Sequence, residues 1–344
     1  MIKTLHALRF VFIMLIVFSH IVGESFDFGG ECGVSFFFML SGFVLALGYG
    51  GRVGRGLFDT NAFLMRQLLK FYPLHLLALV AIVVLDIRSG HFCGWPYLMP
   101  AFLLLQSWIP LNEYNFAGNG PSWFLCDILF CYVLFSKAYL WLNRLTRTSL
   151  AWLLVVVVVA YLMFAFAIPP DSVNSILYVA PWMRLIDFSM GILLCRLYCS
   201  ASGRQWAQRM AGHSVTASEL LAMALLAASL LVYPILPQRL HSVALFWLVI
   251  PPFLLFFTMA EKGHGFATRL LKHPSLQWLG SISLEIYLLH MLVLRIANSL
   301  LAGLGIEEGW PMVMSSLGLL VLVAWLTKIF FVDKIYASLI KYVI

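Results

Sequence analysis

The chain has 344 residues, of which 62% are hydrophobic and 11% are charged, and its mean hydropathy is +0.94. This balance excludes a soluble globular protein and indicates an all-α polytopic membrane protein. The net charge of +7 is small, and the basic residues cluster between apolar segments, so the charge reflects membrane topology and no nucleic-acid partner is expected. We expect a single integral-membrane domain over residues 1–344.

Ten apolar segments are long enough to cross a bilayer, which takes about 20 residues for a helix. No small-residue cleavage site follows the first segment, so a removable signal peptide is not expected. The ten predicted transmembrane helices cover residues 7–23, 33–50, 70–87, 122–141, 149–168, 176–197, 217–234, 241–259, 276–299 and 311–331.

The loops between these segments differ in charge. Arginine and lysine gather in residues 51–70, 142–148, 196–210 and 261–273, whereas acidic residues lie in the alternate loops. Because basic loops stay on the cytoplasmic side, this pattern predicts that both termini are cytoplasmic. The acidic residues of the outer loops are Glu24, Asp27, Glu31, Asp171, Glu307 and Glu308.

Two further segments belong to no predicted span. Residues 96–109 are apolar but too short to cross the membrane, and we expect a re-entrant or interfacial half-helix on the outer side. Irregular backbone at membrane depth is tolerated where it lines a cavity, so this segment suggests a pocket open to the outside. Residues 200–216 form the most polar loop and are expected to be a connector.

The six cysteines show neither a CxxC motif nor the Cys/His spacing of a metal site, so no metal is predicted. Cys32 and Cys93 both fall in predicted outer loops, where a disulfide could join them.

The first apolar segment carries Arg9 and His20, eleven residues apart. On a helix this spacing returns to within about 20° of the same face, displaced by roughly 16 Å. Ionisable groups inside a membrane mark function by default, although a lone histidine can also be a packing residue. Histidine can accept a proton from a hydroxyl nucleophile, and arginine binds phosphate or carboxylate through two parallel hydrogen bonds.

A second basic pair, Arg66 and Lys70, lies one turn apart at the cytoplasmic end of the third segment. The two side chains could clamp a polyanionic cytosolic ligand such as the phosphates of coenzyme A. Simple anchoring at the membrane surface explains the same residues. Ser41, in the aromatic second segment, could be a nucleophile, but a bond to its own backbone is the favoured interpretation.

The later segments contain several buried ionisable residues. Asp127 follows the helix start at Pro121 and Ser122, and Arg184 and Asp187 are spaced for a structural salt bridge. In the ninth segment, Glu285 and His290 lie about 140° apart around a helix, so they cannot face one point. We expect Glu285 to orient a catalytic histidine and His290 to line the outer mouth.

Together these segments resemble the membrane-bound acyltransferase-3 family. The resemblance implies a ten-helix enzyme that passes an acyl group, usually acetyl from acetyl-CoA, to a hydroxyl of an extracytoplasmic carbohydrate, with Arg9 and His20 as its catalytic signature. It extends over residues 1–300. The matching pieces are Arg9 with His20, residues 33–43, residues 63–75, residues 119–125, residues 184–191 and residues 280–290.

Two positions depart from the family pattern. The family often has a glutamate where Ile128 stands, and the neighbouring Asp127 points about 100° away on a helix. Lys70 replaces an arginine, which keeps the charge and loses the two-pronged hydrogen bonding. We also expect this chain to lack the extracytoplasmic esterase-like domain that some relatives add.

The predicted function is therefore transfer of acetyl or another short acyl group from cytoplasmic acyl-CoA to an extracytoplasmic glycan, in a bacterial inner membrane. Catalysis is assigned to His20 as general base, with Arg9 and Glu285, and the donor is placed against Arg66, Lys70 and Arg9. The expected partners are membrane lipid and a carbohydrate or glycolipid acceptor. A transporter or flippase for an anionic or glycolipid substrate is the alternative, since it would use intramembrane Arg and His equally well. The acceptor side is assigned to Asn119, Trp123, Asp127, Tyr287 and His290.

Overall fold

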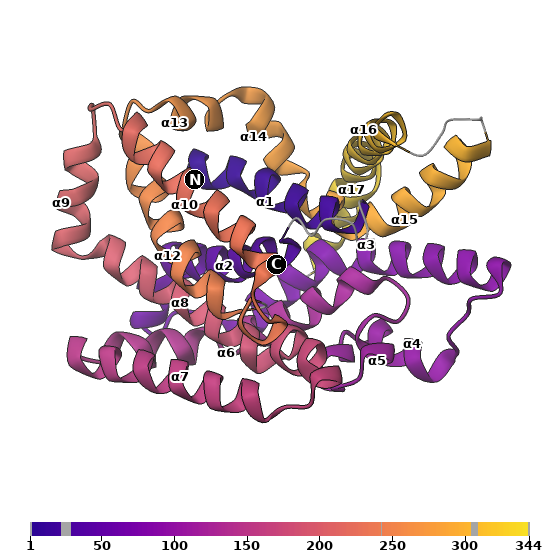
Figure 1. Cartoon of the computed structure of the whole chain (residues 1–344), viewed down its shortest axis with the longest axis horizontal. Helices are drawn as coiled ribbons and strands as arrows, with labels where there is room; N and C mark the ends of the chain where they lie inside the picture. Colours follow the sequence, from indigo (N-terminus) through magenta and orange to yellow (C-terminus); the bar gives the residue numbers. More distant parts are fainter. Residues whose placement is uncertain (1, 22–28, 242, 304–308, 343–344) are drawn as a thin grey trace.

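A computed structural model describes residues 2–21, 29–241, 243–303 and 309–342, and within these ranges the chain is helical with no strands (Figure 1). Nine helical segments there are long and apolar enough to cross a membrane. They are α1 (Lys3–Ile21), α2 (Gly30–Gly54), α3 (Thr60–Ser89), α6 (Trp123–Arg144), α7 (Arg147–Ala167), α10 (Thr216–Val232), α12 (Ala244–Met259) with its flanking turns, α15 (Ser283–Gly303), and α16 (Trp310–Thr327) continued by α17 (Asp333–Leu339).

The remaining predicted span, residues 176–197, is broken. Its first part is Pro170–Val179 and its second is α8 (Pro181–Cys199), and the two are bent by 41°. The break falls before Pro181, where Ala180 has an extended ψ of 134°. A residue that precedes proline is driven out of the helical region by the proline ring, which explains the bend. Counting this pair as one span gives ten, and each of the ten predicted segments matches one of them. The side on which the termini lie stays a prediction.

Helix α2 is the most buried span and packs most closely against α8. Gly42 and Gly191 make this approach possible, because a Cβ at Gly42 would lie 2.0 Å from the Phe188 carbonyl oxygen and one at Gly191 would lie 2.0 Å from that of Met39. Small residues let membrane helices pack backbone to backbone. The pair α2–α8 therefore forms the tightly packed centre of the bundle.

A buried ion pair reinforces this centre. Arg184 donates a 2.7 Å hydrogen bond to Asp187, and both side chains are fully buried. The indole of Trp247 on α12 donates to Asp187 at 2.6 Å, and Arg184 donates to Ser35 on α2 at 3.4 Å. The pair thus ties α2, α8 and α12 together, as expected for a structural salt bridge.

The short apolar segment after α3 does not cross the membrane. It forms α4 (Trp95–Phe102) and a 3-10 turn (Gln106–Trp108), followed by α5 (Asn112–Asn115). His75 and Tyr72 of α3 hold its end, with hydrogen bonds of 3.1 and 3.0 Å to the carbonyls of Ala101 and Phe102. The predicted half-helix is present, and whether it re-enters the membrane or lies on its surface stays a prediction.

One expectation is wrong, and one possible disulfide is absent. Residues 200–216 are not a simple loop, because Ser200 caps the helix α9 (Ala201–Met210) by accepting a 3.1 Å hydrogen bond from the Gly203 amide. Cys32 is buried within α2 and all six cysteines are free, so Cys32 and Cys93 form no disulfide.

The short helices α11 (Gln238–His241), α13 (Phe266–Leu271) and α14 (Pro274–Ser281) complete the described chain. Glu24, Asp27, Glu307 and Glu308 lie outside the described residues.

Candidate active site

Helix α1 contributes to two separate cavities. His20, at its carboxyl end, lines a cavity of about 800 Å³, here called the His20 cavity. Arg9, three turns earlier, lines a second cavity of about 390 Å³, here called the Arg9 cavity. The two predicted ionisable residues therefore line different cavities, consistent with their spacing of about 16 Å along a helix.

The Arg9 cavity is enclosed by helices and is mainly apolar. Arg9 and Lys70 bring positive charge to it, and His6 and Gln67 add polar groups. Its apolar walls come from α2, α3, α6 and α15, and they are formed by Phe37, Leu40, Val44, Leu45, Leu47, Phe63, Phe71, Phe124, Leu125, Ile128 and Leu284.

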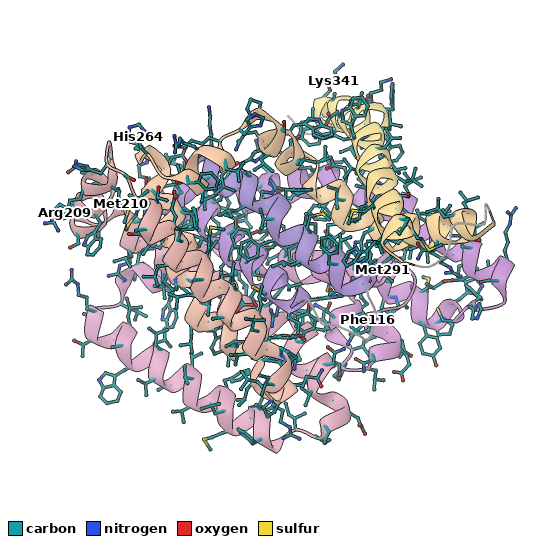
Figure 2. All side chains as sticks on the ribbon, turned by 45° about the horizontal axis from the view of Figure 1, so that its top comes forward. Phe116, Arg209, Met210, His264, Met291 and Lys341 are labelled. Carbon is teal, nitrogen blue, oxygen red and sulfur yellow. The ribbon has the colours of Figure 1, made fainter. Side chains whose placement is uncertain are left out.

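The His20 cavity has a different chemistry. Its wall combines residues of several spans with the segment between α5 and α6, and Figure 2 shows Phe116 of that segment and Met291 of α15 on the same side of the molecule. Arg295 forms an ion pair with Asp86 that joins α15 to α3. Its polar and aromatic lining residues are His20, Asp86, Asn112, Glu113, Phe116, Trp123, Tyr178, Tyr287, Arg295 and Asn298.

His20 has a second imidazole beside it. The ring of His290 stacks on that of His20, with centroids 5.2 Å apart and planes 25° apart. His290 is fully buried, and its Nδ1 lies 2.6 Å from the carbonyl of Tyr287. A carbonyl only accepts, so Nδ1 carries a proton, and among the described residues Nε2 has no hydrogen-bond partner. His290 thus lies behind His20 instead of lining the mouth as predicted.

The segment that opens α6 is fastened to α15 by two hydrogen bonds. The Asn119 amide donates to the carbonyl of Leu288 at 2.9 Å, and the Tyr287 hydroxyl donates to the carbonyl of Pro121 at 2.8 Å. Ser107 also donates to the carbonyl of Trp123 at 3.1 Å. These bonds place Trp123 in the cavity wall, while Asn119 itself is buried.

Two predicted carboxylates line neither cavity. Glu285 is buried and lies 3.8 Å from Lys328, at the start of the π-helical turn between α16 and α17, and not beside His20. Asp127 is fully buried, whereas its neighbour Ile128 faces the Arg9 cavity. Ile128, where the resemblance implies a glutamate, therefore brings an apolar side chain to that cavity, and Asp127 lines neither cavity.

The two residues of the predicted clamp, Arg66 and Lys70, do not line the same cavity. Lys70 lines the Arg9 cavity, but Arg66 turns back along its own helix and donates to the Ala62 carbonyl at 3.1 Å. Sequence reasoning missed Asp86 and Arg295 at the His20 cavity. Arg295 is a lone cation within the predicted span 276–299, which is a signal that could have identified it.

Comparison with known proteins identifies the family. The family model described as an acyltransferase domain matches residues 2–329. The chain belongs to the acyltransferase-3 family. A curated relative, acyltransferase MdmB of Streptomyces mycarofaciens, is 29% identical over 301 residues, which cover 82% of this chain and 73% of the relative. No solved structure matches the chain.

Family membership confirms the resemblance stated from the motifs. The protein is an acyltransferase with several membrane-spanning helices. Among the described residues no group of three or more His, Cys, Asp or Glu side chains is arranged to hold a metal ion.

Proposed function

We propose that this acyltransferase moves a short acyl group, such as acetyl, from coenzyme A in the Arg9 cavity to a hydroxyl of a carbohydrate in the His20 cavity. The observation that carries this proposal is that one helix presents a permanent cation to one cavity and an imidazole to the other. A transporter would use similar residues, but family membership favours acyl transfer.

The Arg9 cavity suits an acyl-CoA donor. The guanidinium of Arg9 and the ammonium of Lys70 can bind phosphate oxygens through charge-assisted hydrogen bonds. Beyond these cations the walls are apolar, which suits the acyl chain and the pantetheine arm. Arg66 is left out of the donor site because it does not line the cavity.

The His20 cavity suits a carbohydrate acceptor. Sugar hydroxyls both donate and accept hydrogen bonds, and the carboxylates of Asp86 and Glu113 accept them while the amides of Asn112 and Asn298 can do both. The rings of Phe116 and Trp123 offer flat apolar faces for the sugar's carbon skeleton. An O-antigen, an exopolysaccharide or a lipid-linked glycan would present such groups.

His20 is the proposed general base. Its imidazole takes the proton of the acceptor hydroxyl while the hydroxyl oxygen attacks the thioester carbon. The carbon–sulfur bond then breaks, and the imidazolium returns the proton to the departing thiolate, which yields an ester and free coenzyme A. A relay through a side-chain hydroxyl such as Ser41, which lines the Arg9 cavity, is the other route. A labelled acyl-protein that accumulates without acceptor would identify that relay.

The basic loops support a cytoplasmic opening for the Arg9 cavity and an extracytoplasmic opening for the His20 cavity. The family resemblance, rather than the charge of the loops, is our ground for placing the protein in a bacterial inner membrane, with lipid and a glycan or glycolipid as its partners.

The test uses vesicles that contain the full chain, acyl-labelled acetyl-CoA on one side and glycan on the other. His20→Gln should lower ester formation by about 10²- to 10⁴-fold, the usual contribution of a general base. His91→Gln is the matched control, because His91 lines neither cavity and its imidazole contacts the exposed hydroxyl of Ser89. Ester formation by His20→Gln at the wild-type rate would exclude His20 as the base.

A further inference from the structure

Tyr287 is the one described residue that lines both cavities. Its side chain is 6% exposed although it borders two open spaces, so it is enclosed by neighbours and fills the space between them. The neighbouring residues of α6 divide between the cavities, since Trp123 lines the His20 cavity and Phe124 lines the Arg9 cavity. The boundary between the two spaces therefore passes through Tyr287 and the start of α6.

One face of α15 runs continuously along both cavities. Leu284, three residues before Tyr287, lines only the Arg9 cavity, and Met291, four residues after it, lines only the His20 cavity. Residues three and four apart lie on one helix face. A group that moves along this face from one cavity to the other must pass the Tyr287 side chain.

Specific contacts hold Tyr287 in this position. Its hydroxyl donates to the Pro121 carbonyl at 2.8 Å, and its ring meets that of Phe124 edge to face, with centroids 5.2 Å apart. Asn119 adds a second bond from the same segment to α15, through the carbonyl of Leu288. The tyrosine is thus held across the path by the segment that also carries Trp123 of the acceptor cavity.

We propose that Tyr287 is the barrier between the donor and acceptor cavities and that the acyl group passes it during transfer. This inference rests on the proposed function. The barrier keeps water of the His20 cavity from the thioester in the Arg9 cavity. Without it, water attacks the thioester carbon, the carbon–sulfur bond breaks, and the products are a carboxylic acid and free coenzyme A. Excluding water from a reactive group is an established use of closed active sites.

The test measures both reactions of the full-length protein in vesicles: thiol release from acetyl-CoA without acceptor, and ester formation with acceptor. Tyr287→Ala should raise acceptor-independent hydrolysis about tenfold or more and lower the ratio of transfer to hydrolysis, because water of the His20 cavity then reaches the thioester. Tyr287→Phe keeps the ring but loses the bond to Pro121, and a rise of about two- to fivefold is expected from losing one hydrogen bond.

Two residues of the same helix that line neither cavity provide matched controls. Leu292→Ala and Ile296→Ala each remove a large apolar side chain from α15 outside both cavities, so neither should raise hydrolysis more than about twofold. Equal hydrolysis by Tyr287→Ala and Leu292→Ala would overturn the inference.

A second measurement does not depend on activity. A Leu284→Cys variant, with the exposed Cys93 and Cys199 replaced by serine, is treated with a membrane-impermeant thiol reagent added on the side of the His20 cavity. Labelling is expected only when Tyr287→Ala is added. Labelling with Tyr287 intact overturns the barrier, whereas a wild-type protein that forms no ester overturns the proposed function and leaves the labelling result standing.

Discussion

The two cavities share one lining residue, Tyr287, but differ in the elements and side chains that line them. The Arg9 cavity is walled by membrane spans and combines cations with apolar side chains, whereas the His20 cavity is about twice as large and adds to its spans the segment that connects α5 and α6. Spans are constrained by packing against each other, and connecting segments tolerate sequence change. We therefore expect substitutions in that segment to be tolerated better than substitutions in the wall of the Arg9 cavity, which makes the segment the proposed place for changes in acceptor specificity.

The contrast can be tested most strongly at Arg9. Arg9→Gln should raise the KM for acyl-CoA by about 10- to 100-fold, because hydrogen bonds to a charged group contribute about 1.5–3 kcal/mol. The KM for the acceptor should stay the same, and both constants are measured by initial rates in vesicles.

Arg55→Gln is the control for Arg9, since Arg55 lies at the end of α2 outside both cavities and donates to the Gly51 carbonyl. A change in acceptor KM instead of donor KM would show that the two cavities have been assigned the wrong substrates.

A smaller effect is expected from the divided basic pair on α3. Lys70→Gln should raise the donor KM about two- to fivefold, with a weaker effect at high salt, since exposed ion pairs contribute up to about 1 kcal/mol. Arg66→Gln, one turn earlier, should change it less than about twofold, because Arg66 bonds to its own helix. Equal effects of the two substitutions would show that the sequence-based clamp was correct.

The smallest effect is expected at the ion pair of the His20 cavity. Asp86→Asn and Arg295→Gln should each raise the acceptor KM about two- to fivefold and leave the donor KM unchanged, as expected for a partly exposed pair. Asp333→Asn, which breaks the exposed 3.1 Å pair with Lys328 outside the His20 cavity, is the control for the acceptor KM. An acceptor KM unaffected by both substitutions would remove this pair from the acceptor site.

Much of the fold could be predicted, because a bilayer imposes length and polarity on every segment that crosses it. The ten predicted segments all match helical spans, including the one that is bent. The bend could have been predicted from Ala180 and Pro181, since proline restricts the backbone of the residue before it. The helix α9 was missed because hydropathy finds membrane segments and does not distinguish a polar helix from a polar loop.

The site was predicted less completely, and helix geometry explains where it failed. Positions on one helix can be related by angle, so Ile128 could be separated from Asp127, and Glu285 from His290. Which of two faces meets a cavity depends on neighbouring helices, however. Glu285 pairs with Lys328, which lies near the carboxyl end of the chain, and the ring of His20 stacks on the ring of His290.

The close contact of Gly42 with α8 has a consequence for how the chain is made. Its partner Gly191 lies 149 positions later. At a synthesis rate of 5–20 residues per second, the face of α2 waits about 7 to 30 s for that partner. During this interval α2 can be held by lipid, by the insertion machinery, by α1 and, once it has been made, by α6, since both helices pack beside it. Substitutions at Gly42 or Gly191 should therefore show themselves first as poor membrane assembly, before any defect in the finished enzyme can be measured.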